Sequence, residues 1–333
     1  MSCPFAGRNS RGATFCNNRT VTGGKTMQNG TCWLDDAGNL IQAHGGMIAR
    51  FGDKWYWYGE NKDGPTLRSG GVGFRVDVIG FSCYSSFDLV NWRYEGLALG
   101  ANKDDPNHPL HTSKIAERPK VICCEKTGKY VMWFHADTAD YILGAAGCAV
   151  ADKPEGPFEF LYWTHPNRRD CRDINVYKDP VTGKAYVIHS GDWNHTLYFS
   201  ELNEDYTGFT GNCFAQLAEQ TREGGTVCYH DGVYYCVSSG CTGWSPNPTL
   251  YATTRHLSTP MLLVDNPCEG PKYRTTFDGQ STYIFEADGK FYLMLDHWKK
   301  EDLQKSGYSI LPIEFDGERM TVTWQTDFNG LHY

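Results

Sequence analysis

One hairpin pattern recurs five times along the chain and constrains the fold more than any other feature. Each copy has an apolar run, a polar turn containing glycine, and a second run rich in aromatic and apolar residues. The copies are GGMIARFGDKWYWYGE (45–60), KVICCEKTGKYVMWFH (120–135), INVYKDPVTGKAYVIHS (174–190), TVCYHDGVYYCVSSG (226–240) and STYIFEADGKFYLMLDHW (281–298). Apolar runs joined by a short glycine turn are typical of β-hairpins.

The spacing of the five hairpins indicates how they assemble. Their turn glycines recur at intervals of roughly 50 to 75 residues, the size of a four-stranded propeller blade with its loops. Weaker strand pairs lie between them at 83–96, 148–160 and 197–211, and no convincing helical period competes. Because no linker divides the chain into two β domains, the sequence predicts an all-β, five-bladed β-propeller. It forms a single domain over residues 1–333, with 1–30 as an N-terminal extension that can pack on the propeller.

A polar residue stands just before each hairpin, where the innermost strand of each blade begins. The five residues are His44, Glu117, Asp173, Glu223 and Gln280. Equivalent ends of the inner strands converge on one mouth of the central channel, so these side chains are expected around one pocket. A carboxylate at a strand start is often only a turn cap, but capping requires no common register across five blades. Like charges in such a pocket push their pKa values apart and leave one carboxyl protonated near neutrality.

A pocket with several carboxylates among aromatic side chains suits glycoside hydrolysis. One protonated carboxyl donates to the leaving oxygen while water attacks from the opposite face of the sugar. Trp193, Trp244 and Trp298 each follow a core hairpin and are candidate platforms for the apolar face of a sugar. Packing within the propeller explains each tryptophan equally well.

Composition excludes several other classes of function. The formal charge of −8 argues against a nucleic-acid partner, which requires a basic face. No apolar run approaches the roughly 20 residues of a membrane span, so no membrane partner is expected. The first residues lack the basic and apolar regions of a signal peptide. Thirteen cysteines without a zinc-like spacing are interpreted as reduced, mostly buried thiols, which favours a cytoplasmic setting.

Several of these segments together resemble a known enzyme family. They are IQAHGGMI, WYWYGENK, CYSSFDLVNW, ERPKVI, KYVMWFH, RDINVYKD, GWSPNP and GQSTYIF. In this order, from about Trp33 to about Pro312, they resemble glycoside hydrolase family 43, and most of all its branch of exo-β-1,3-galactanases. The resemblance implies an oligosaccharide or polysaccharide substrate.

The resemblance also implies roles for individual residues. Glu223 corresponds to the general acid, Asp173 to the residue that orients the acid and modulates its pKa, and Glu117 to a carboxylate that binds sugar hydroxyls. Most of the wider family has an aspartate base in blade one, where this chain reads QAH at 42–44. The galactanase branch implicates a glutamine that corresponds to Gln280, acting through an imidic tautomer or by positioning water. A structural hydrogen bond is the alternative role for this amide.

Further matched positions are expected to contact the substrate. They are Glu60, His44, Tyr141, Asp192, Thr242, Trp244 and Trp298. No metal or other cofactor is predicted. Calcium in the channel of this wider family stays an alternative, with His44 the nearest residue, although no acidic ligand loop is visible.

The resulting hypothesis is an exo-acting, inverting glycoside hydrolase, an exo-β-1,3-galactanase acting on arabinogalactan-type β-1,3-galactan. An α-L-arabinofuranosidase or β-xylosidase of the same family is the first alternative, and a non-catalytic carbohydrate-binding propeller is the second. Three departures from the family pattern bear on the sugar. Glycines follow Glu223 where a small residue and proline are usual, 308–312 lacks a tryptophan, and the loop 63–80 is longer than expected.

Overall fold

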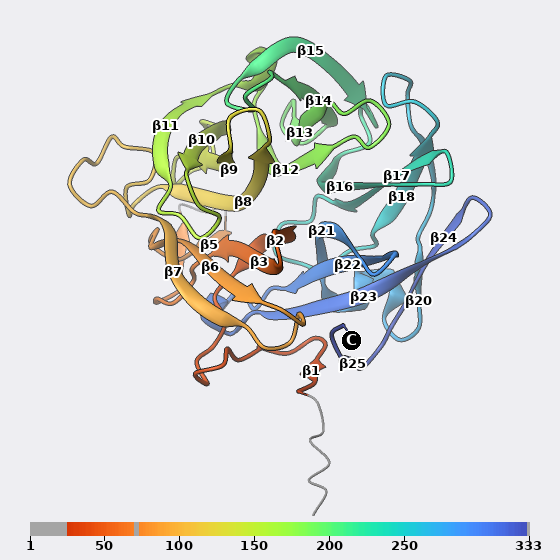
Figure 1. Ribbon diagram of the computed structural model, residues 1–333, viewed down its shortest axis with the longest axis horizontal. Helices are drawn as coiled ribbons and strands as arrows, with labels where there is room; N and C mark the ends of the chain where they lie inside the picture. The colour runs from red at the N-terminus through yellow and green to blue at the C-terminus, as the bar shows by residue number, and fades with distance from the viewer. Residues whose placement is uncertain (1–24, 70–72, 332–333) are drawn as a thin grey trace, which may run out of the picture.

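Five four-stranded antiparallel sheets form the blades of the computed structural model, which describes residues 25–69 and 73–331 (Figure 1). Blade 1 contains β2 (His44–Phe51), β3 (Lys54–Glu60), β6 (Gly80–Ser86) and β7 (Arg93–Gly100). Blade 2 contains β8 (Ile115–Cys124), β9 (Lys129–Asp137), β10 (Ala145–Ala151) and β11 (Glu159–Thr164). Blade 3 contains β12 (Arg172–Lys178), β13 (Ala185–Gly191), β14 (Thr196–Leu202) and β15 (Phe209–Gln216).

The last two blades follow the same order from inside to outside. Blade 4 contains β16 (Arg222–His230), β17 (Val233–Gly240), β18 (Leu250–Thr254) and β19 (Leu262–Asp265). Blade 5 contains β21 (Gln280–Ala287), β22 (Lys290–His297), β23 (Gly307–Asp316) and β24 (Arg319–Thr323), with β20 (Cys268–Glu269) added in parallel beside β24. The innermost strands β2, β8, β12, β16 and β21 contact one another in this cyclic order, and β21 returns to β2. The predicted five-bladed β-propeller is therefore confirmed.

The core is divided among the interfaces between neighbouring blades. Five clusters of buried apolar side chains are found in the described residues, one at each interface. Strand β3 illustrates how the sequence achieves this. Trp57 packs toward blade 5 beside Tyr308, and the next residue, Tyr58, packs toward blade 2 beside Phe134. Successive side chains of a strand point to opposite faces, so a blade buried on both faces needs apolar residues at consecutive positions.

Short elements lie in the loops within and between the blades. The hairpin β4 (Leu67–Ser69) and β5 (Gly73–Arg75) is inserted between β3 and β6. Three 3₁₀ turns lie in loops: η1 (Pro166–Arg168), η2 (Tyr273–Asp278) and η3 (Leu303–Lys305). The eleven cysteines of the described ranges are all free, and seven of them are buried. None of the helical turns in these ranges has the length and apolar character needed to cross a bilayer.

The first and last described segments of the chain meet beside blade 5 and close the ring. Strand β1 (Met27–Gln28) pairs with β25 (Asp327–Phe328), and Thr31 forms a bridge with Tyr308 of β23. Residues 25–30 of the predicted N-terminal extension therefore pack on the propeller, while residues 1–24 lie outside the described ranges.

Asn29 is the polar centre of this closure. Its side chain is 4% exposed. Its Nδ2 donates to the carbonyls of Ile310 (3.3 Å) and Gln325 (2.9 Å), and its Oδ1 accepts from the N–H of Ile310 at 3.0 Å. One amide thus links the first segment of the chain to two parts of the last.

Replacing Asn29 by alanine is expected to lower the free energy of unfolding by about 1–3 kcal/mol, because three backbone groups lose their side-chain partner, two of them in buried hydrogen bonds. Urea unfolding followed by tryptophan fluorescence measures the change. The control is Gln28→Ala, since the side chain of Gln28 is exposed. Equal stability of the two variants would contradict the role of Asn29 in closing the ring.

Candidate active site

Each innermost strand carries an irregularity within its first few residues. The pairing with the second strand shifts register after His44, Glu117, Arg172, Glu223 and Ser281. A bulge of this kind turns the local side chains away from the regular alternation and is common next to active sites. Four of the five bulges contain a residue with positive φ: Gly45 (57°), Arg118 (52°), Asp173 (41°) and Gly224 (62°).

The strand starts surround one cavity of about 350 Å³. Nine of the residues singled out from the sequence line it: Glu60, Glu117, Tyr141, Asp173, Trp193, Glu223, Trp244, Gln280 and Trp298. Arg118, Asp140, Arg172, Asn194, Cys241 and Gly243 complete the lining. The common register of the blades therefore brings these side chains together, as the sequence predicted for the strand heads of blades 2 to 5.

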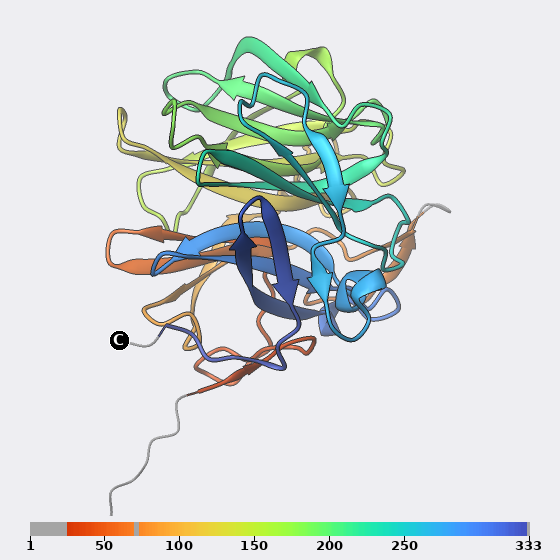
Figure 2. The same ribbon diagram turned by 90° about the vertical axis from the view of Figure 1, so that its right-hand side faces the viewer.

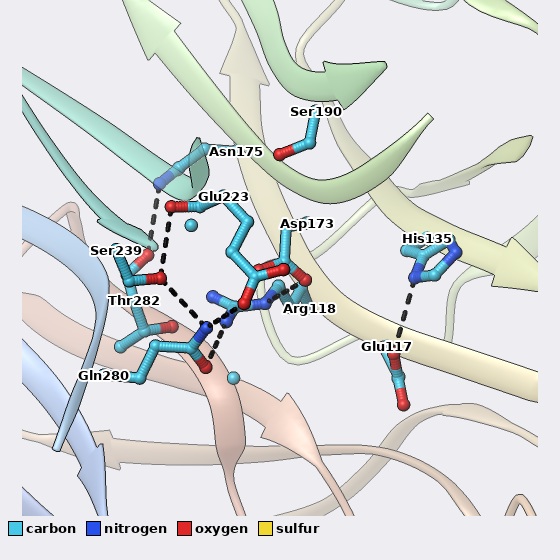
Figure 3. Close-up of polar contacts among 12 residues, drawn as sticks. Glu117, Arg118, His135, Asp173, Asn175, Ser190, Glu223, Ser239, Gln280 and Thr282 are labelled. Carbon is cyan, nitrogen blue, oxygen red and sulfur yellow. Dashed lines mark hydrogen bonds and ion pairs between the residues drawn. The ribbon is translucent and has the colours of Figure 1, made fainter. Parts of the chain in front are cut away.

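Glu223 of β16 faces this cavity, with the amide of Gln280 beside its carboxyl (Figure 3). Gln280 Nε2 donates to Oε1 at 3.1 Å, and Asn194 Nδ2 donates to Oε2 at 3.3 Å. The Cys241 thiol also contacts the carboxyl. Burial and the nearby charge of Asp173 raise the pKa of Glu223 to about 8, against the opposing charge of Arg118. The group is therefore protonated at neutral pH and able to donate a proton.

Arg118 of β8 joins residues from other blades (Figure 3). Its side chain is buried, with Nε 2.9 Å from Asp173 Oδ1 of blade 3. Its Nη2 donates to Gln280 Oε1 of blade 5 at 2.8 Å, and its backbone N–H donates to Glu60 Oε1 of blade 1 at 3.0 Å. The guanidinium thereby fixes both groups that flank Glu223.

The hydrogen bonds of Gln280 fix the orientation of its amide. Oε1 accepts from Arg118 and from Trp298 Nε1 (3.0 Å), and both of these groups are donors only. Nε2 donates to Glu223 and to Ser239 Oγ (3.1 Å). An oxygen that already accepts two N–H groups is poorly placed to carry the proton of an imidic tautomer. This arrangement favours a positioning role for the amide.

Glu117 is held in its charged form. Tyr141 donates to Oε1 at 2.8 Å, and His135 Nδ1 lies 3.4 Å from Oε2. Burial opposes ionisation, but the neighbouring His135 imidazole and the charge of Lys62 outweigh it and lower the pKa of Glu117 to about 2. His135 contacts Asp137 on its other side at 2.9 Å. Burial of this imidazole is likewise outweighed by the two carboxylates, which raise its pKa to about 9.

His44 heads β2 as predicted but does not line the cavity. It is fully buried, and its Nε2 lies 3.2 Å from both Gln42 Oε1 and the Tyr308 hydroxyl, on whose ring it stacks. Blade 1 instead presents Glu60, the residue paired with His44 on β3. Gly45 makes this arrangement possible, because a Cβ at this position would lie 2.4 Å from Glu60 Oε1. Lys62 Nζ balances the carboxylate at 2.6 Å.

Two other predicted contact residues lie next to the lining without being part of it. Asp192 accepts from the Tyr198 hydroxyl and forms an ion pair with Arg169 at 3.3 Å, while the following residues, Trp193 and Asn194, reach the cavity. Their left-handed backbone explains this offset. Thr242 likewise bonds within its own loop, with its hydroxyl donating to the carbonyl of Ser245 and accepting from Asn247, while Cys241 and Gly243 line the cavity.

The sequence signalled only some of the remaining lining residues. Arg118 and Arg172 stand next to strand-head carboxylates in the sequence, and each pairs with an aspartate: Arg118 with Asp173 and Arg172 with Asp170. Arg172 also stacks on the ring of Trp193 at 4.4 Å. Asn194 and Cys241 carried no sequence signal, because loop conformation alone brings them to Glu223. Among the residues that the structure describes, no group of three or more His, Cys, Asp or Glu side chains is arranged to hold a metal ion.

Comparisons with solved structures place this architecture among glycosidases. A family-43 β-1,3-galactosidase in complex with galactodeoxynojirimycin has a TM-score of 0.82 and 32% identity, covering 91% of this chain and 100% of that chain. The exo-β-1,3-galactanase of Phanerochaete chrysosporium with β-1,3-galactotriose has a TM-score of 0.81 and 29% identity, covering 91% and 68%. That of Clostridium thermocellum has a TM-score of 0.78 and 31% identity, covering 92% and 66%.

The sequence itself matches a family model over most of its length. A search of curated proteins found no match. The model for glycosyl hydrolases family 43, however, matches residues 46–310, which include all five innermost strands except for the first two residues of β2. The chain therefore belongs to glycosyl hydrolase family 43 and is a glycoside hydrolase.

Proposed function

We propose that the protein is an exo-acting, inverting β-1,3-galactanase that removes galactose from the end of β-1,3-galactan of the arabinogalactan type. The observation that carries the proposal is the raised pKa of Glu223, to about 8, within a cavity lined by tryptophan and carboxylate side chains. Two solved relatives are named exo-β-1,3-galactanases, and a third is named a β-1,3-galactosidase. A cavity of about 350 Å³ suits recognition of a chain end rather than of a long internal segment.

In this mechanism Glu223 protonates the glycosidic oxygen as the bond to the anomeric carbon breaks. The electron pair of that bond leaves with the protonated oxygen, and water attacks the opposite face of the oxocarbenium-like carbon. Asp173 keeps Glu223 protonated until this step through its charge. Glu117, ionised through its contact with His135, accepts hydrogen bonds from sugar hydroxyls.

Gln280 positions Glu223, to which its Nε2 donates, rather than acting as a strong base. Its oxygen is held by Arg118 and Trp298. A water molecule becomes strongly acidic once its oxygen bonds to the cationic carbon, so its proton passes to solvent without a strong base. The lack of an aspartate base at 42–44 is compatible with this late proton loss.

A substrate comparison tests the proposed function directly. Aryl β-galactoside and β-1,3-galactobiose are expected to be hydrolysed, whereas aryl α-L-arabinofuranoside and aryl β-xyloside are not. Proton NMR of the first product is expected to show α-galactose, as inversion requires. If only the arabinoside or the xyloside were hydrolysed, the protein would be an α-L-arabinofuranosidase or a β-xylosidase instead. Sugar binding without turnover would identify a carbohydrate-binding propeller, and initial β-galactose would contradict inversion.

Glu223→Gln is expected to lower kcat on β-1,3-galactobiose by about 10²- to 10⁴-fold, because the leaving sugar no longer receives a proton. A 2,4-dinitrophenyl galactoside needs no such protonation, so its kcat is expected to fall far less. Stopped-flow or steady-state kinetics on both substrates measure the difference. Glu314→Gln, an exposed glutamate of β23, serves as the control. An equal loss on both substrates would contradict the general-acid role of Glu223.

The pH dependence of kcat/KM follows from the same group. Glu223 acts in its protonated form, so kcat/KM is expected to fall as the pH rises through about 8. Asp173→Asn removes a negative charge that raises the pKa of Glu223, and the falling limb is therefore expected to move to lower pH. A limb that stays in place or moves to higher pH would show that Asp173 does not set this pKa.

A further inference from the structure

The inserted hairpin β4–β5 lies at the end of the propeller that carries the cavity. It belongs to the loop 63–80 of blade 1, and it forms a two-stranded sheet of its own instead of joining the blade. In Figure 2 it extends at the right-hand edge, toward which the loops of blade 4 also project. At Gly73 it approaches Trp244, a side chain of the cavity lining that follows β17.

Gly73 makes this contact. A Cβ placed on Gly73 would lie 2.6 Å from Trp244 Nε1 and 3.3 Å from Trp244 Cδ1. Its backbone φ is not positive, so the conformation accepts any L-residue and only space requires glycine. The backbone of the hairpin thus lies directly against the indole ring.

The contact continues from Trp244 to the reacting groups. Trp244 meets Trp298 edge to face, with ring centroids 5.2 Å apart and an interplanar angle of 89°. Trp298 Nε1 donates to Gln280 Oε1 at 3.0 Å, and Gln280 Nε2 donates to Glu223 at 3.1 Å. A displacement of Trp244 is therefore transmitted through one ring contact to the amide beside the acid.

The hairpin is also fixed at its base. The backbone N–H of Leu303 donates to Thr66 Oγ1 at 2.9 Å, and the Gln304 side chain bonds to Asp63. Leu303 and Gln304 both belong to the segment that follows Trp298. The hairpin and Trp298 are thus tied together independently of the Trp244 contact, which keeps Gly73 in register with the indole.

We propose that the β4–β5 hairpin forms an outer wall of the sugar site and that Gly73 is a positioning residue acting through Trp244. The glycine admits Trp244 to a place where it supports Trp298, and the two indoles offer an apolar face to a neutral sugar ring. This inference deepens the proposed function and rests on it for the identity of the sugar. In this view, the β4–β5 hairpin determines the width of the site and, through Trp244 and Trp298, the position of Gln280.

A double-mutant cycle tests the inference. Gly73→Val is expected to lower kcat/KM by about tenfold or more, equivalent to about 1.4 kcal/mol, with kcat falling as well as KM rising because Gln280 shifts. In a Trp244→Ala background the same substitution is expected to change kcat/KM by no more than about twofold, since the ring that valine displaces is gone. The melting temperature and the tryptophan emission maximum are recorded for every variant.

The matched control is Gly100→Ala. Gly100 has no positive φ, and a Cβ there would meet no heavy atom within 4 Å, so its kinetics are expected to equal those of the wild type. Gly73→Ala, which adds a single methyl group, completes the cycle if Gly73→Val does not fold. Unchanged kinetics in both Gly73 variants, or an equal loss with and without Trp244, would overturn the inference.

A failure of the Gly73–Trp244 coupling can be distinguished from a failure of the proposed galactanase activity. The cycle is measured on whichever glycoside the wild type hydrolyses, so turnover of an arabinoside would refute the galactanase while leaving the coupling of Gly73 and Trp244 readable. If no glycoside is hydrolysed, calorimetric Kd values for galactose and arabinose replace kcat/KM in the same cycle.

Discussion

The buried guanidinium of Arg118 is the interaction on which the site depends. The cavity gathers carboxylates from four blades, and such a group of like charges is stable only with compensating cations and hydrogen bonds. Arg118 supplies both, because it contacts Asp173 and Gln280 with its side chain and Glu60 with its backbone N–H. The other carboxylates have separate partners: Lys62 pairs with Glu60, and His135 lies beside Glu117. Glu223, by contrast, has neutral amides and a thiol as its hydrogen-bond partners, and its pKa rises to about 8.

The propeller produces this arrangement by repeating one local distortion. A bulge lies near the start of every innermost strand, and in blades 2 and 3 the positive φ falls on Arg118 and Asp173 rather than on glycine. A non-glycine residue in the left-handed region costs free energy that the surrounding structure has to supply. The two residues share an ion pair of 2.9 Å across the blade interface. The strained backbone thus coincides with the contact that fixes the charge balance of the site.

Sequence reasoning recovered the features that depend on periodicity. Five hairpins with a glycine turn predicted five blades. The position just before each hairpin identified Glu117, Asp173, Glu223 and Gln280 as residues of one cavity. Features that depend on contacts between distant segments were not predictable in this way. His44 stands at the corresponding position of blade 1, yet the bulge at Gly45 allows Glu60, its partner on β3, to line the cavity instead.

Loops and chain ends were the second limit of sequence reasoning. The three residues at 192–194 adopt left-handed conformations, which brings Asn194 rather than Asp192 to the cavity. No sequence pattern predicted that β1 pairs with β25 or that the β4–β5 hairpin contacts Trp244. In each case the conformation of a few loop residues determines the contact, and hydrophobic periodicity does not predict loop conformation.

The proposed chemistry depends on Glu223, which stays protonated at neutral pH because the blades bury it beside Asp173. The direct measurement is an NMR titration of the protein labelled with ¹³C at the glutamate side-chain carboxyl, with the Glu223 resonance assigned from its loss in Glu223→Gln. The account predicts that this carboxyl titrates near pH 8. A midpoint at the ordinary value of about 4.3 would contradict it, because Glu223 would then carry no proton to give at neutral pH.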